Sequence, residues 1–111
     1  MNPILLEEPV DTNISLFEDG MLFCRARGFP VPEVLWYQNG TRLDVAALGN
    51  VNVTAVMMSR ITTSTLTITN ATFANSGRYF CSATSSDPNV ISVNSSEVDI
   101  IVRRKWSTLS L

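Results

Sequence analysis

The chain contains no histidine, only two cysteines and no apolar run long enough to cross a membrane. Histidine is the side chain most often used as a general base and as a metal ligand, so its absence removes many catalytic and metal sites. A membrane helix requires about 18 consecutive apolar residues. The carboxylates are scattered, and no Gly-rich phosphate loop is present. We therefore predict no catalytic residue, no metal, no cofactor and no membrane span in this chain.

Charged residues are few and slightly acidic in balance. Eight basic and ten acidic side chains give a net charge of −2 and a pI near 4.9. This balance supplies no general attraction for nucleic acid or for acidic membranes, so we predict neither partner. A weak candidate site for a sulfated glycan is formed by basic residues, namely Arg25, Arg27 and Arg103-Arg104-Lys105. The overall acidity of the chain argues against this site.

The length of 111 residues predicts one domain. Met1-Asn2-Pro3 lacks the basic start and the apolar core of a signal peptide. We expect Met1 to be an expression start and the chain to be one domain of a larger protein.

Short segments of alternating polar and apolar residues indicate β-strands. The clearest is Thr65–Thr69, which places Leu66 and Ile68 on one face and threonines on the other. Asn39-Gly40 is a strong signal for a hairpin turn. Val45-Ala46-Ala47-Leu48 has helical character but is too short to assign. Further strands are predicted at Ile4–Leu6, Thr12–Phe17, Met21–Arg27, Glu33–Gln38, Val51–Ala55 and from about Val90 to Val102.

Four residues carry a resemblance to a known family. Tyr79 precedes Cys81 by two residues, the only other cysteine is Cys24, and Trp36 follows Cys24 by twelve residues. This set resembles an immunoglobulin-superfamily domain. Gly28-Phe29-Pro30-Val31-Pro32 and Asn39-Gly40 are similar to the intermediate (I-set) branch, and the resemblance runs from about Pro3 to Val102.

The resemblance implies an all-β fold, a two-sheet antiparallel immunoglobulin-like β-sandwich with one inter-sheet disulfide. Cys24 and Cys81 would form that disulfide, Trp36 would pack against it, and the Tyr79 hydroxyl would bond upstream backbone. Such a domain would span residues 3–102, with 103–111 a tail or the start of a linker. The family pattern also implies that the first strand breaks at a proline, here Pro9, and changes sheets.

Asn75 departs from the family pattern, which usually has Asp at this position and pairs it with an arginine. Arg60 is the expected partner. We therefore predict a hydrogen bond between Asn75 and Arg60 in place of an ion pair, weaker by about 1 kcal/mol.

Two features indicate an extracellular compartment: the cysteines are placed for a bridge, and Asn-x-Ser/Thr sequons are in excess. Nine asparagines would produce about two sequons by chance, whereas the chain has five. Strands rich in Ser and Thr also contain sequons by composition alone. The alternative that the excess has nothing to do with glycosylation therefore stays open. The extracellular reading predicts a secreted or cell-surface protein, with N-glycosylation candidates at Asn13, Asn39, Asn52, Asn70 and Asn94.

A binding role is what the resemblance implies, and strand parity suggests the surface. Leu35, Tyr37, Phe80 and Ile101 each neighbour an inward residue, so we predict that they form an outward apolar strip that binds a protein ligand or a homophilic partner. The role would be that of a receptor or adhesion domain. Isolated exposed apolar residues are also common on sandwiches. The alternative function is that of a structural spacer domain in a matrix or muscle array. We expect the apolar segment Val56-Met57-Met58 to fill an edge strand rather than to bind a ligand.

Overall fold

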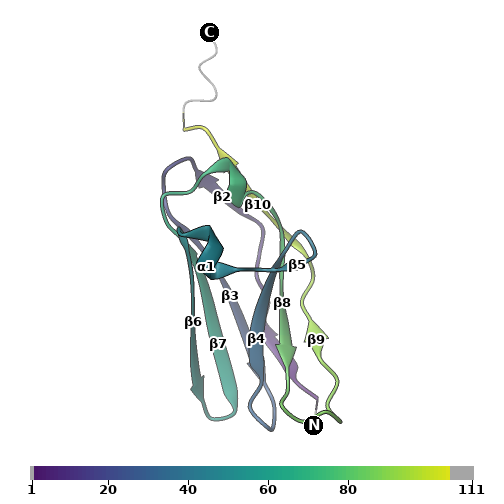
Figure 1. Ribbon diagram of the computed structural model, residues 1–111. Helices are drawn as coiled ribbons and strands as arrows, with labels where there is room; N and C mark the ends of the chain where they lie inside the picture. Colours follow the sequence, from purple (N-terminus) through teal and green to yellow (C-terminus); the bar gives the residue numbers. More distant parts are fainter. Residues whose placement is uncertain (1, 106–111) are drawn as a thin grey trace.

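The computed structural model describes residues 2–105, and within them two β-sheets pack as a sandwich (Figure 1). One sheet has the strand order β1-β3-β7-β6 and the other β2-β10-β8-β4-β5, with β9 pairing β8. All strand pairs are antiparallel except β2 with β10. The elements are β1 (Ile4–Glu7), β2 (Thr12–Ser15), β3 (Gly20–Arg27), β4 (Glu33–Gln38), β5 (Thr41–Arg42), α1 (Val45–Leu48), β6 (Val51–Met58), β7 (Ile61–Ile68), η1 (Phe73–Asn75), β8 (Gly77–Thr84), β9 (Val93–Asn94) and β10 (Val98–Arg103).

The predicted sandwich and its disulfide are confirmed. Cys24 on β3 is bonded to Cys81 on β8, with 6.5 Å between their Cα atoms, so the bridge joins the two sheets. Trp36 on β4 is 3% exposed, and its Nε1–H donates to Ser64 Oγ at 2.9 Å. The buried apolar residues from both sheets surround this centre: Ile14, Leu22, Ala26, Val34, Val51, Leu66, Ile68, Ala71, Tyr79, Ala83, Val98, Ile100 and Val102.

The first strand changes sheets across Pro9. β1 pairs with β3 in the four-stranded sheet, whereas β2 lies parallel to β10 in the six-stranded sheet. Proline has no N–H to donate, so it is suited to the gap between two paired segments. Residues 106–111 of the predicted tail lie outside the described residues, and Arg103 is the last residue of β10.

The Tyr79 hydroxyl donates to Asn75 O at 2.6 Å, which is the upstream backbone bond that the resemblance implied. Burial raises the pKa of Tyr79 to about 12, because the charged phenolate is poorly solvated there. The hydroxyl therefore stays protonated at physiological pH and keeps donating.

The expected bond between Asn75 and Arg60 was wrong. Asn75 Oδ1 accepts from Asn50 Nδ2 at 2.8 Å and from the Thr72 N–H at 2.9 Å, so a second asparagine fills the arginine's role. The Arg60 guanidinium lies 5.0 Å from the centre of the Phe29 ring, where it makes a cation–π contact. Arg60 is in the turn between β6 and β7, and Asn75 follows the far end of β7.

Several strand boundaries differ from the prediction: β2 ends at Ser15 rather than at Phe17, and the two strand ends that meet in the turn between β6 and β7 also differ. β6 continues to Met58 and β7 begins at Ile61, joined by Ser59 and Arg60 with φ of 54° and 65°. These are the angles of a two-residue hairpin turn, formed here without the expected Gly or Asn.

The predicted strand from Val90 to Val102 is in fact two strands, β9 and β10, separated at residues 95–97. At the break, Ser95 Oγ accepts from the Cys81 N–H at 3.0 Å, and the Ser95 N–H donates to Cys81 O at 2.8 Å. The side chain of Ser95 thus takes over one ladder hydrogen bond and interrupts regular pairing.

Candidate functional site

A pair of stacked aromatic rings marks the outer face of the six-stranded sheet. Tyr37 on β4 lies opposite Phe80 on β8, and their rings stack with centroids 4.7 Å apart and planes 3° from parallel. Both point outward because their neighbours Trp36, Tyr79 and Cys81 are buried in the core.

Leu35 extends this stack along β4. It lies two residues before Tyr37, is half-buried and sits opposite Ser82. We call Leu35, Tyr37 and Phe80 the aromatic patch. The patch is apolar and continuous across two paired strands, which is the usual centre of a protein-binding surface.

Charged side chains border the aromatic patch on both sides. Arg42 on β5 lies opposite Tyr37. On the other side, Arg78 on β8 approaches Glu97 and Asp99, with N–O distances of 3.5 Å to each. All three of these side chains are at least 47% exposed, so the ion pairs are solvated and define a polar rim rather than a buried network.

Ile101, the fourth residue of the predicted strip, does not join the other three. It pairs with Asn13 on β2, while Asp99 of the same strand pairs with Arg78. The Arg78–Asp99 pair therefore lies between Ile101 and Phe80. Parity placed Ile101 on the correct face, but the register of β10 against β8 moves it along the sheet and away from the aromatic patch.

Three of the five sequon asparagines share this outer face or its end. Asn13 lies beside Ile101, and Asn94 lies opposite Ser82. Asn39 is in the hairpin turn after β4, with φ of 51°, and its Oδ1 accepts from the Arg78 N–H at 3.0 Å. The positions surround the aromatic patch without occupying it.

The other two sequons lie with the four-stranded sheet. Asn52 on β6 is exposed between the buried Val51 and the half-buried Val53, as its predicted outward orientation requires. Asn70 follows β7, and its N–H donates to Asp19 Oδ1 at 3.0 Å. All five side chains are exposed, and their glycosylation stays a prediction.

The basic residues considered for a sulfated glycan are not brought together. Arg25 and Arg27 are at the end of β3 that pairs with Thr63 and Ile61. Arg103 O accepts from the Leu16 N–H, beyond the other end of β3. The two ends of β3, Gly20 and Arg27, are seven residue steps apart, or roughly 23 Å, so the two groups form no common cluster.

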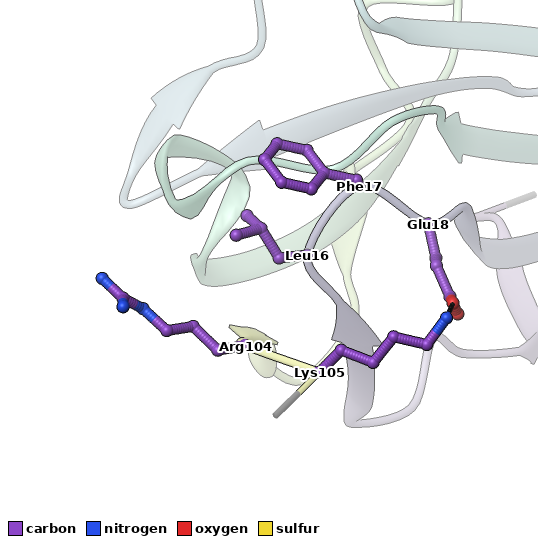
Figure 2. A pocket seen from close by; sticks show the side chains of 5 residues that line it. All are labelled: Leu16, Phe17, Glu18, Arg104 and Lys105. Carbon is purple, nitrogen blue, oxygen red and sulfur yellow. Dashed lines mark ion pairs between the residues drawn. The ribbon is translucent and has the colours of Figure 1, made fainter. Parts of the chain in front are cut away.

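One hollow was not predicted from the sequence. Leu16, Phe17, Glu18, Arg104 and Lys105 line it, with a volume of about 660 Å³ (Figure 2). Lys105 Nζ reaches Glu18 Oε2 at 2.6 Å, while Arg104 points away on the other side. Phe17 follows the last residues of β2 and is 67% exposed, and the sequence pattern gave no sign of a hollow beside it.

Clusters of metal-binding side chains are absent from the described residues. Within 2–105, no three His, Cys, Asp or Glu side chains come close enough to hold a metal ion. Both cysteines are used in the disulfide. The same span contains no helix with the length and apolarity needed to cross a membrane.

Comparison with known proteins agrees with this architecture. Among curated proteins, Peroxidasin homolog pxn-2 of Caenorhabditis elegans is 42% identical and Roundabout homolog 3 of Homo sapiens is 44% identical, each over 41 residues. Each alignment covers 37% of this chain and 3% of the relative, so the chain spans a small part of the proteins it matches.

Among solved structures, the titin domains z1z2 in complex with telethonin are 25% identical with a TM-score of 0.78. That match covers 95% of this chain and 49% of the titin chain. The profile of the family described as Immunoglobulin domain matches residues 2–85, which hold both cysteines, Trp36 and Tyr79. The chain therefore belongs to the immunoglobulin domain family.

Proposed function

We propose that this immunoglobulin domain is a non-enzymatic recognition module of an extracellular receptor or adhesion protein. It would bind a protein partner through the aromatic patch. The observation that carries the proposal is the outward stack of Tyr37 on Phe80, extended by Leu35 and bordered by charged side chains. Aromatic anchors inside a polar rim are the common composition of binding surfaces.

The extracellular setting rests on two features that agree. The Cys24–Cys81 disulfide is typical of oxidising compartments. The five sequon asparagines are all exposed, as attachment of a glycan requires. A domain folded in the cytosol would need no sequons and would keep both cysteines reduced.

A structural spacer domain is the second candidate, and the similarity to titin domains favours it. A spacer needs a stable sandwich and no binding surface. The aromatic patch is the feature that separates the two roles, because a spacer would tolerate charge at Tyr37 and Phe80.

Replacing both rings with carboxylates, Tyr37→Glu together with Phe80→Glu, should abolish partner binding. The two like charges would face each other at the centre of the aromatic patch and would have to be desolvated on contact. Because the patch is well below the roughly 800 Å² per partner of a standard interface, we expect micromolar or weaker affinity. The measurement is therefore the binding of fluorescent tetramers of the domain to cultured cells, which gains from multivalency.

The matched control is Thr63→Glu with Thr65→Glu, which places the same charges on the outer face of the four-stranded sheet. Circular dichroism and thermal unfolding should show both variants folded. Equal cell binding by the parent and the Tyr37/Phe80 variant, or no binding by the parent, would support the spacer role instead.

A further inference from the structure

The four outermost strands of the sandwich differ sharply in how well they resist pairing with another chain. β1 has four residues and a register shift between Leu5 and Glu7, β2 has four residues, and β5 has two. β6 has eight residues, paired to β7 in continuous register without a bulge. It lies at the edge of its sheet, beside β7 (Figure 1). Short or bulged edges are normal protection against edge-to-edge association, and β6 lacks that protection.

The turn after β6 determines which backbone groups face outward. Ser59 and Arg60 form a two-residue hairpin turn, so Met58 and Ile61 are a hydrogen-bonded pair. Hydrogen-bonded and non-hydrogen-bonded pairs alternate along an antiparallel ladder. Val53, Ala55 and Met57 therefore turn their N–H and C=O groups away from β7.

The side chains of β6 do not protect this edge either. The sequence Val51-Asn-Val-Thr-Ala-Val-Met-Met58 contains no charge and no proline. Its last three residues are among the exposed apolar side chains, with Val56 at 60%, Met57 at 55% and Met58 at 70%. The Asn52 side chain points to the outer face rather than along the edge, so a glycan there would leave the outward backbone groups accessible.

We propose that β6 is a self-association edge, which pairs antiparallel with β6 of a second copy of this chain about a two-fold axis at Ala55. In that register Ala55 lies opposite its own copy, and Val53 lies opposite Met57. Val53, Ala55 and Met57, whose groups face outward, are thus placed symmetrically about the axis, as an isologous contact requires. A second copy fits because an uncharged strand brings no like charges together.

The expected association is weak. A single pair of short strands is a small contact, at the low end of interface sizes, so we expect a weak and transient dimer. The edge belongs to the four-stranded sheet, whereas the aromatic patch lies on the six-stranded sheet. The inference is therefore independent of the proposed function.

Sedimentation equilibrium of the unglycosylated chain from about 10 µM to about 1 mM tests this directly. The parent should shift from monomer to dimer, and Met57→Lys should weaken the dimer at least tenfold by placing a charge on the edge. The matched control is Met21→Lys on the inner strand β3, where the methionine is also exposed, and it should dimerise like the parent.

A crosslink provides the second measurement. Cα atoms of an antiparallel hydrogen-bonded pair are about 5.5 Å apart, which suits a disulfide. Mild oxidation of Ala55→Cys should give a covalent dimer, and Thr65→Cys on β7 should not. A parent that stays monomeric at the highest concentration, a dimer unaffected by Met57→Lys, or Ala55→Cys crosslinking no faster than Thr65→Cys would overturn the proposal.

Discussion

Replacing Trp36 with alanine should lower the free energy of unfolding by about 3–5 kcal/mol. Trp36 is the largest side chain beside the disulfide and is 3% exposed, so its removal leaves a cavity between the two sheets. The substitution also removes the donor to Ser64 Oγ, which is buried on β7. Urea unfolding followed by tyrosine fluorescence and circular dichroism gives the difference.

Trp36→Phe separates the two contributions. Phenylalanine keeps most of the ring but has no N–H, so only the hydrogen bond to Ser64 and part of the packing are lost. We expect about 1–3 kcal/mol for this change. A loss below about 1 kcal/mol for Trp36→Ala would mean that Trp36 does not organise the core.

Removing the disulfide should lower the free energy of unfolding by nearly as much as Trp36→Ala does. The double change Cys24→Ala, Cys81→Ala frees a loop of 57 residues, which the chain-entropy estimate values at about 4 kcal/mol. Both cysteines are fully buried, so reduction without unfolding should also be slow. Urea unfolding of the double variant, compared with the parent, measures the loss.

A second comparison distinguishes the loop effect from packing. The parent treated with a reductant in urea loses the bond but keeps both sulfur atoms, whereas the double alanine variant also loses their volume. The two should differ by only about 1–2 kcal/mol. If reduction left the unfolding midpoint unchanged, the bridge would contribute nothing to stability.

The sandwich could be predicted because its strongest signals are local or unique. Alternation in Thr65–Thr69 identified the inward Leu66 and Ile68, and both are fully buried. The chain has one possible cysteine pair, and the family resemblance assigned it. Pro9 marked a break in the first strand, because proline has no N–H to donate to a ladder, and the family resemblance implied that the strand changes sheets there.

Register along neighbouring strands could not be predicted in the same way. Parity gives the face of a residue but not its position along the adjacent strand, which is why Ile101 was grouped with Phe80 but lies beside Asn13. The Ser59-Arg60 turn lacks the usual turn residues, so the full length of β6 was missed. The Asn75–Asn50 bond depends on a tertiary contact for which the chain has no local pattern.

The central claim is that this domain functions outside the cell as a recognition module. The most direct test of its setting is peptide mapping by mass spectrometry of the protein isolated from its natural source and digested without reduction. We expect a linked Cys24–Cys81 peptide and N-glycan on at least one exposed sequon, with Asn52 the clearest case. Two alkylatable cysteines together with five unmodified asparagines would contradict the account and support an intracellular spacer domain.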